Sequence, residues 1–200
     1  PRGGEFDLVL ADGTQVWLNA ESRLRYPVEF SGKERKVVLE GEAYFQVKKN
    51  PSLPFRVEIR NQVIEVLGTE FNVSGYKDEV HVYTTLVNGK VKVATTGRDM
   101  TLLPGEQCVL DTGDGSMIRQ QVDVDKIISW KKGKFILEEQ TLEQIMQKLA
   151  RWYDITVFYQ NPALKNKVFK GSVPRYAELQ QVLNILEKTG EVQFHIQNRT

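Results

Sequence analysis

The feature that most constrains this chain is a β-type run interrupted by a single glycine, residues 36–47, which read KVVLEGEAYFQV around Gly41. A weaker copy, residues 83–93, reads YTTLVNGKVKV around Gly89. Glycine tolerates positive φ and marks a turn or bulge within a strand pattern. A strand–glycine–strand unit used twice predicts an all-β body of stacked or paired hairpins, and it does not suggest a catalytic pocket.

Short apolar runs separated by turn residues continue through the first 124 residues. Alternating leucines and valines flank the dipeptide Asp12-Gly13, which is strongly favoured in tight hairpins. Further runs lie at residues 37–39, 43–47, 55–59, 63–67, 70–73, 80–83, 89–93, 101–103 and 107–110. No stretch keeps a helical period beyond one turn, so we expect a sandwich, a jelly roll or a short β-solenoid.

The pattern changes beyond about residue 125. Thr141 and Gln144 fit a capping box, and apolar residues then recur at helical spacing up to residue 153. A second helix is predicted over residues 179–186, with Gly190 as its stop. Strand candidates lie at residues 134–137, 155–159, 168–171 and 192–196. The predicted order is β-α-β-β-α-β, a small α+β module. We therefore expect two domains, residues 1–125 and 130–200.

Charge and hydropathy limit the possible partners. The net charge of +1 argues against a dedicated nucleic-acid binder, and no run approaches the apolar length of a membrane span. Residues 1–129 carry a net −3 and residues 130–200 a net +4, which hints at an acidic partner for the second domain, although solvation explains so small a difference equally well. The abrupt start at Pro1-Arg2 suggests a segment excised from a longer protein.

The sequence contains no phosphate-binding glycine loop, HExxH, CxxC or nucleophile elbow, so we expect no enzyme and no cofactor. Glu40 and Glu42 flank Gly41, but an acid–base pair would need a cleft and divergent pKa values, so a structural role is favoured. Cys108 lies in a strand-like run and is expected to be a buried hydrophobe. His81 and His195 have no ligand-spaced neighbours and are expected to be surface or strand-face residues.

Other short patterns have similarly simple interpretations. Asp111, Asp114 and Asp123 could suggest calcium, but their spacing matches no EF-hand-type loop, and a solvated turn is expected. Asn72 and Asn198 begin glycosylation sequons, which arise often by chance. A set of aromatic residues could line a sugar-binding face, but core filling is the simpler interpretation. These aromatics are Trp17, Tyr26, Tyr44, Phe45 and Tyr76.

Six motifs occur in an order that resembles the FecR-like periplasmic domain. They are residues 8–19 (LVLADGTQVWLN), 39–47 (LEGEAYFQV), 67–73 (LGTEFNV), 85–91 (TLVNGKV), 103–107 (LPGEQ) and 129–135 (SWKKGKF). The last resembles the junction in Bacteroidetes-type members to a C-terminal module that is similar to the short N-terminal domain of secretins and TonB-dependent receptors. The match covers nearly the whole chain. One departure is that the module usually closes with a further apolar strand, whereas this sequence stops at Thr200.

The resemblance implies the periplasmic sensor region of a transmembrane anti-sigma factor. Such proteins receive a signal from the N-terminal domain of an outer-membrane TonB-dependent transducer and pass it to an extracytoplasmic-function sigma factor. The sigma-binding cytoplasmic segment and the single membrane helix of the full-length protein would lie outside this sequence. No cofactor, metal or nucleic acid is implied.

We expect the transducer domain to bind the C-terminal module by packing on it or by adding to an open sheet edge. The candidate contacts are Tyr153, Arg175, Tyr176, Val192, Gln193, Phe194, His195, Ile196 and Gln197. A rival hypothesis is a carbohydrate-binding β-sandwich with an accessory domain, which would need an exposed coplanar pair such as Trp17 and Tyr44. A third is a scaffold subunit of a secretin-like assembly.

Overall fold

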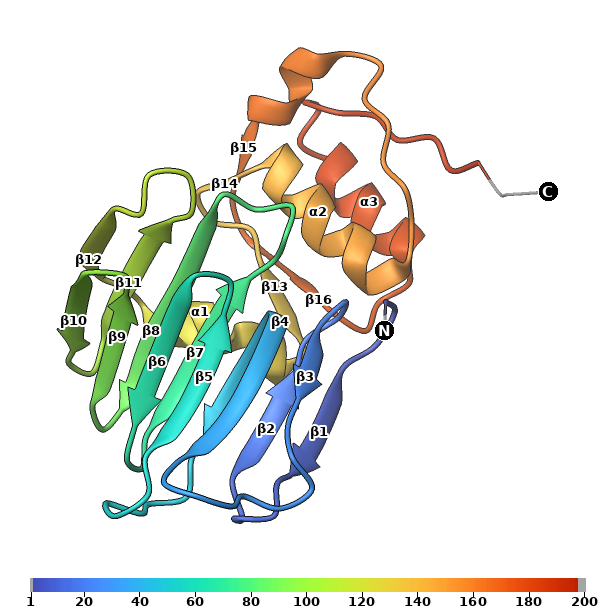
Figure 1. The fold of residues 1–200 in the computed structure, drawn as a ribbon. Coiled ribbons are helices and arrows are strands. Elements are labelled where there is room, and N and C mark those ends of the chain that lie inside the picture. Colours follow the sequence, from blue (N-terminus) through green and yellow to red (C-terminus); the bar gives the residue numbers. More distant parts are fainter. Residues whose placement is uncertain (1, 198–200) are drawn as a thin grey trace. The chain divides into compact units, whose positions relative to one another are not determined.

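The computed structural model describes residues 2–197 and divides into two compact units, Pro1–Ile128 and Ser129–Thr200. The first unit is built almost entirely of strands, coloured blue to green in Figure 1. These are β1 (Phe6–Val9), β2 (Gln15–Leu18), β3 (Arg23–Arg25), β4 (Arg35–Gln46), β5 (Phe55–Ile59), β6 (Gln62–Val66), β7 (Glu70–Gly75), β8 (His81–Asn88), β9 (Val91–Thr95), β10 (Arg98–Leu102), β11 (Glu106–Asp111) and β12 (Met117–Gln121). A short helix, α1 (Val124–Ile127), follows them.

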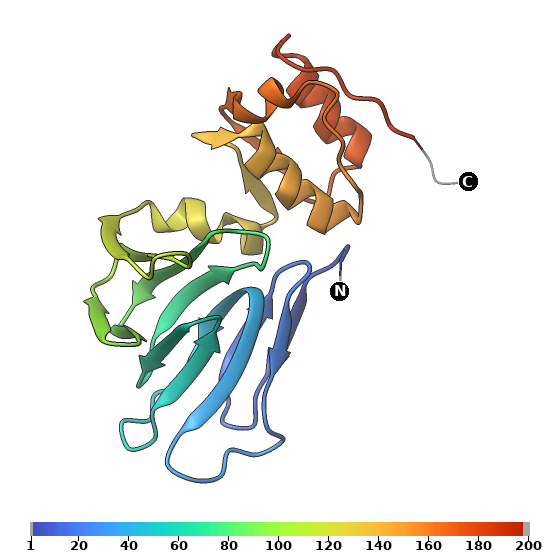
Figure 2. The ribbon, with the colours of Figure 1, turned by 45° about the horizontal axis from the view of Figure 1, so that its top comes forward.

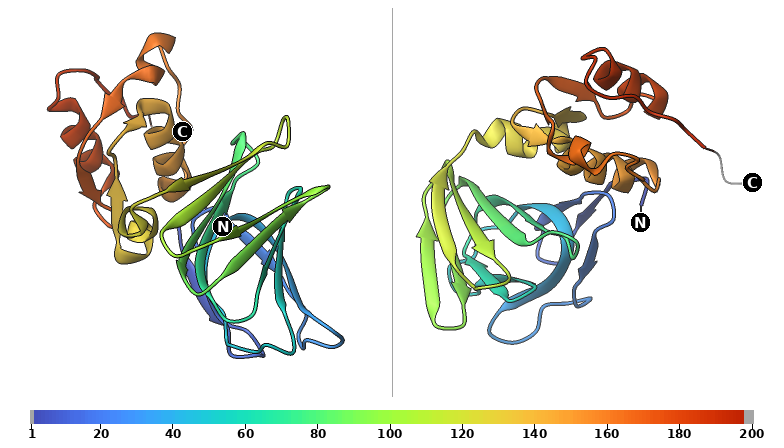
Figure 3. Two further views of the ribbon diagram at one scale, coloured as in Figure 1. Left: turned by 90° about the vertical axis from the view of Figure 1, so that its left-hand side faces the viewer. Right: turned by 90° about the horizontal axis from the view of Figure 1, so that it is seen from above.

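All twelve strands are connected by pairing: nine form a path from β10 to β12, while β2 (with β1) and β3 pair with β4 beside it, and the whole folds into two facing sheets. Sheet A contains β1, β2, the second half of β4, β7, β8, β11 and β12. Sheet B contains β3, the first half of β4, β5, β6, β9 and β10. Figures 2 and 3 show both sheets curving around a common interior. The all-β prediction is confirmed: the strands form one large, nearly closed sheet whose two layers enclose the core.

Gly41 lies where β4 passes from one sheet to the other. Before it, Val38 pairs with β3 and β5 in sheet B, and after it, Ala43 pairs with β2 and β7 in sheet A. Its φ is +93°, which only glycine adopts without strain. Gly89, with φ +98°, lies between β8 of sheet A and β9 of sheet B. The two glycine-centred runs therefore share a function: each carries the chain between the sheets.

The core of the first unit fills the space between the sheets. The rings of Phe45 and Phe71 stack with centroids 5.1 Å apart, and Phe55 of sheet B lies 6.1 Å from Phe45. Gln62 of sheet B donates through Nε2 to Thr84 Oγ1 of sheet A at 3.0 Å, so a polar contact also crosses the interior. Because the apolar residues of the central strands alternate with outward-facing ones, both sheets direct one face into this core.

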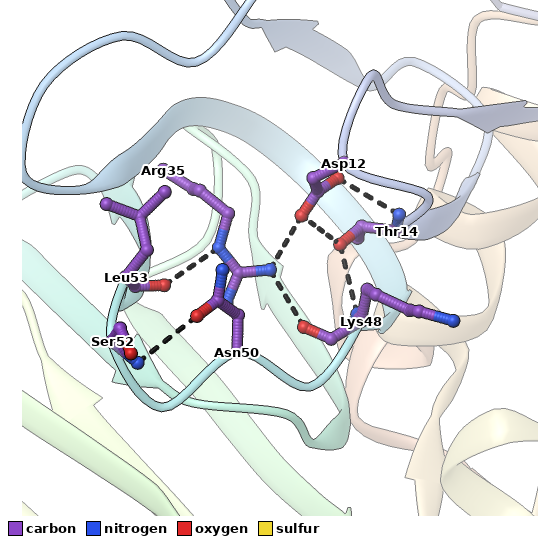
Figure 4. A network of polar contacts seen from close by, with 7 residues as sticks. All are labelled: Asp12, Thr14, Arg35, Lys48, Asn50, Ser52 and Leu53. Carbon is purple, nitrogen blue, oxygen red and sulfur yellow. Dashed lines mark hydrogen bonds and ion pairs between the residues drawn. The ribbon is translucent and has the colours of Figure 1, made fainter.

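A buried arginine at the start of β4 ties together two connections of the first unit, the β1–β2 turn and the β4–β5 connection (Figure 4). Arg35 donates through Nη1 to Asp12 Oδ2 at 2.7 Å and to the Lys48 carbonyl at 2.8 Å, and through Nε to the Leu53 carbonyl at 2.9 Å. Thr14 Oγ1 donates to Asp12 and accepts from the Lys48 N–H. The Arg35 side chain is 1% exposed, so these groups compensate a charge that is excluded from water, although the buried Nη2 itself makes no hydrogen bond with any described residue.

The second unit contains two helices and short strands. Its elements are β13 (Lys134–Ile136), β14 (Gln140–Thr141), α2 (Leu142–Tyr153), the 3-10 helix η2 (Pro162–Asn166), β15 (Val168–Phe169), β16 (Ser172–Pro174) and α3 (Leu179–Glu187). Another 3-10 helix, η1 (Ile128–Lys132), begins at the last residue of the first unit. The short strands pair as β13 with β16 and β14 with β15, both antiparallel.

Both predicted helices of the second unit are present. Thr141 and Gln144 form the predicted capping box of α2, in which each side chain bonds the other residue's backbone N–H. The apolar faces of α2 and α3 pack into one core with Phe135, Phe169 and Val173. The helix α3 ends at Glu187, and Gly190 follows with φ +74°. The α+β prediction is therefore confirmed for this unit.

Two of the predicted strands of this unit are wrong. Residues 155–159 and 192–196 do not form strands, although their alternating apolar and polar residues are typical of one. The inward side chains of both segments do pack against the core of the second unit; they are Ile155, Val157, Tyr159 and Phe194. The alternation therefore correctly indicates which side chains face the core. Alternation alone does not predict a strand ladder, because a ladder also needs a partner strand at hydrogen-bonding distance.

Candidate partner-binding surface

The glutamates around Gly41 hold strands together. Glu40 contacts Lys77 Nζ at 2.9 Å and Arg25 Nη2 at 3.1 Å, and these cations, Lys77 foremost, lower the pKa of its carboxyl. Glu42 accepts from Asn19 Nδ2 at 2.7 Å and from Asn72 Nδ2 at 2.9 Å. Each carboxylate is thus engaged by neighbouring elements, which supports the structural role expected for both.

The remaining chemical candidates also have structural surroundings. Cys108 is buried, and burial raises the pKa of its thiol to about 11. Asp111 Oδ1 accepts the backbone N–H of Gly113, and Asp114 Oδ1 accepts that of Ser116, so these aspartates organise the β11–β12 turn. Asp123 caps α1. Within residues 2–197, no group of three or more histidine, cysteine or acidic side chains is arranged to hold a metal ion.

Neither glycosylation sequon gains support. Asn72 is 2% exposed in β7, with its side-chain amide donated to Glu42, so a glycan could not be attached in the folded state. The second sequon, at Asn198, lies outside the described residues.

The aromatic pair proposed for sugar stacking does not form a flat platform. The rings of Trp17 and Tyr44 meet edge to face at an interplanar angle of 68°, with centroids 5.6 Å apart. Tyr44 is also 3% exposed, and its hydroxyl donates to Glu70 Oε2 at 2.8 Å. Burial and this contact raise the Tyr44 pKa. The condition that the carbohydrate hypothesis required, an exposed coplanar pair, is not met by these two residues.

The outward face of sheet B is covered by charged pairs. Lys36 contacts Glu58 at 2.6 Å, Arg56 bridges Glu34 and Glu65, and Lys92 contacts Asp99 at 2.8 Å. All of these side chains are partly exposed, which is typical of a solvated sheet face. This alternation of charges discourages apolar docking on sheet B.

The second unit places Tyr153, Arg175 and Tyr176 close together, at the end of α2 and after β16. Tyr153 is half-buried, and its hydroxyl donates to the Ala177 carbonyl at 2.6 Å. Arg175 is only 1% exposed, so its side chain belongs to the interior. Tyr176 is 66% exposed, and its ring meets Trp152 edge to face at 5.8 Å. Of these three candidates, Tyr176 is the one that presents a large surface to a partner.

Residues 192–197 form the other part of the predicted surface. Val192 is buried, Phe194 is partly buried, and Ile196 is 48% exposed. Gln193, His195 and Gln197 are exposed. The Phe194 N–H donates to Glu187 Oε1 at 2.7 Å, which fixes the segment to the end of α3.

The predicted set of contact residues did not include residues 155–160, although 155–159 were predicted to be a strand. This segment also runs without a strand ladder, and its odd-numbered apolar residues pack inward while Phe158 is 87% exposed. An apolar residue in the outward register of an otherwise alternating run is the signal that could have identified it. Figure 1 draws this segment and residues 192–197 as coil.

Across the part of the chain that the structure describes, no helix has both the length and the apolar character needed to cross a membrane.

Comparisons with known proteins agree with this architecture. Residues 1–92 match the model of the FecR protein family, and residues 134–200 match that of the FecR C-terminal domain. Two crystal structures of a provisionally assigned anti-sigma factor from Parabacteroides distasonis, at 1.65 and 2.50 Å resolution, are similar over 98% of this chain and 92% of theirs. Their TM-scores are 0.90 and 0.88, at 28% and 29% identity. No protein with curated annotation matches the sequence. With both FecR models matched in order and the fold shared along almost its full length, the chain belongs to the FecR-like anti-sigma factors, a regulatory family.

Proposed function

We propose that this chain is the periplasmic sensor region of a membrane-anchored anti-sigma factor, and that it relays a signal by protein–protein contact. The input would come from the N-terminal signalling domain of an outer-membrane TonB-dependent transducer. The output would reach an extracytoplasmic-function sigma factor through a cytoplasmic segment outside this sequence. In this proposal residues 1–125 form the FecR-like domain and residues 130–200 form the docking module.

The observation that carries the proposal is that two main-chain segments of the second unit have no strand partner among the described residues, although the N–H groups of Ile155 and Phe194 already donate within the unit. Its ladders contain only two or three residue pairs each, and residues 155–160 and 192–197 have no strand partner in the described part of the chain. Both segments nevertheless hold an apolar side against the core. A preformed extended segment whose N–H and C=O groups are open to a new strand is the usual substrate of strand addition.

Exposed apolar side chains of the second unit supply candidate anchors for such a strand. Phe158, Ile196 and Tyr176 are the exposed large apolar residues nearest in sequence to the proposed contacts. We retain the predicted set as the proposed contact residues. Arg175 and Tyr153 are buried or half-buried, so they would support the exposed contacts from within the unit. The carbohydrate-binding alternative receives no such support, because Trp17 and Tyr44 meet edge to face.

The test is calorimetric titration of the chain with the signalling domain of the transducer encoded beside it. Gln193→Pro and His195→Pro remove backbone donors at exposed positions, whereas Gln193→Ala and His195→Ala leave the main chain intact. We expect the proline variants to bind at least about tenfold more weakly, and the alanine variants to bind like the parent protein.

The absence of any complex with the parent chain at about 100 μM transducer domain would refute the relay. Equal weakening by proline and alanine at the same position would refute strand addition at residues 192–197 while leaving the relay itself intact. Phe158→Ala then tests whether the other segment contributes an anchor.

A further inference from the structure

Arg175 occupies the centre of an aromatic cluster in the second unit. Its guanidinium carbon lies 4.0 Å from the ring centroid of Trp152, 5.3 Å from that of Phe135 and 5.6 Å from that of Trp130. The side chain is 1% exposed, so these contacts form away from water, where cation–π attraction is strongest. Tyr176 extends the cluster outward from Trp152.

The backbone around the cluster is tied at the same place. The Arg175 N–H donates to the Gly133 carbonyl at 2.9 Å, directly beside the pairing of Lys134 with Pro174. Gly133 has φ +73°, and a β-carbon there would lie 2.6 Å from Tyr176 Cε2. The turn that ends η1 can therefore approach the Tyr176 ring only because residue 133 has no side chain.

The three aromatic partners of Arg175 come from different parts of the sequence. Phe135 belongs to β13 and Trp152 to α2, which are both elements of the second unit's core. Trp130 belongs to η1, the 3-10 helix that begins at the last residue of the first unit. A 3-10 helix of this length has poor intrinsic stability, so its order depends on what its side chains contact. The Trp130 side chain is 6% exposed.

We propose that Arg175 is a pin that fixes the connecting segment, defined here as residues 129–133 at the very start of the second unit, to the core of that unit. The guanidinium is flat and can contact several rings at once, and it holds Trp130 against Trp152 and Phe135. Without it, the connecting segment loses its anchor while the two helices keep their own apolar core. The aromatic cluster around Arg175 then determines how well ordered residues 129–133 are. The outermost ring of this cluster, Tyr176, faces solvent.

The pin requires no partner, so its test is independent of the relay proposed above. Hydrogen exchange by mass spectrometry on the full 200-residue chain compares the parent protein with Arg175→Lys, which keeps the positive charge and loses the planar guanidinium. We expect amides of residues 130–134 to exchange at least about tenfold faster. Amides in the α2 and α3 core should change less than about twofold. Arg98→Lys, an exposed arginine in β10, is the matched control and should leave both regions unchanged.

Two results would overturn the proposal. Parent-like protection of residues 130–134 in Arg175→Lys would show that the guanidinium does not hold this segment. Equal loss of protection throughout residues 134–197 would show that Arg175 supports the whole unit and not the connection. If Arg175→Lys does not fold, Trp130→Leu decides the question: local opening of residues 130–134 supports the pin, and any other pattern contradicts it.

Discussion

The hydroxyl of Ser22 occupies the position toward which a side chain at Gly41 would point. A β-carbon on Gly41 would lie 2.5 Å from Ser22 Oγ and 2.8 Å from its Cα. The same hydroxyl accepts the backbone N–H of Glu42 at 2.8 Å. At the point where β4 leaves one sheet for the other, a serine from the β2–β3 connection thus replaces a ladder partner.

Gly41→Ala should therefore destabilise the first unit strongly. The substitution combines a left-handed backbone with a clash against Ser22, and we expect a loss of about 3 kcal/mol in the free energy of unfolding. Gly97→Ala is the control, because Gly97 has φ +83° but no atom lies within 4 Å of the position that its β-carbon would take. That variant should lose only about 1 kcal/mol. Urea denaturation measures both, and equal losses would show that Ser22 contributes nothing.

The sequence predicts those features of the fold that depend on neighbouring residues, and fails for those that depend on residues distant in the chain. The glycine within an apolar run indicated a special backbone at residue 41, and the capping box at Thr141 located the start of α2, because both signals are local. The role of Gly41 as a crossing point could not be predicted, since it depends on which strands pair with β4 on either side of this residue. The polar strands β3 and β12 were missed because their residues lack the apolar alternation on which the prediction relied.

The interaction surface was harder to predict for a similar reason. Arg175 is among the predicted surface contacts; arginine is exposed in most proteins, but this one is 1% exposed. Its burial follows from Trp130, Phe135 and Trp152 converging on it, which only the tertiary structure shows. Residues 155–159 were predicted to be a strand because alternation reports which side chains face the core, and not whether a partner strand is present.

The buried pair Arg35–Asp12 gives a second prediction. Asp12→Ala leaves the guanidinium of Arg35 buried without its anionic partner, and we expect a loss of about 3–5 kcal/mol. The matched control is Asp99→Ala, which removes the exposed partner of Lys92 and should cost less than about 1 kcal/mol. Denaturant midpoints compare the two variants. A small effect of Asp12→Ala would mean that the carbonyls of Lys48 and Leu53 are sufficient to hold Arg35.

Cys108 should make stability depend on pH in the alkaline range. Burial raises the pKa of its thiol to about 11, whereas an unfolded thiol ionises near about 8.5. The folded state therefore binds the proton more tightly. This contribution is complete below about pH 8.5 and is lost as the pH rises through 11, by roughly 3 kcal/mol in all.

Cys108→Ala is the control for this dependence, because other groups also titrate in the same range. The free energy of unfolding of the parent protein should fall more steeply between pH 8.5 and 11 than that of the variant. Parallel curves would contradict the burial effect. In the native state at pH 8, the thiol should also react with a disulfide reagent only as fast as the unit opens.

The two helices of the second unit begin differently, which gives a fourth prediction. Thr141 caps α2 through its hydroxyl, whereas Glu178 at the start of α3 makes no capping hydrogen bond in the described structure. Thr141→Ala should lower the free energy of unfolding by about 1 kcal/mol, and Glu178→Ser should raise it by up to about 1 kcal/mol, since serine can accept the free N–H groups of the first turn. Thermal unfolding of both single variants checks the signs. Glu178→Ala separates capping from loss of the carboxylate: if alanine stabilises α3 as much as serine does, capping is not the cause.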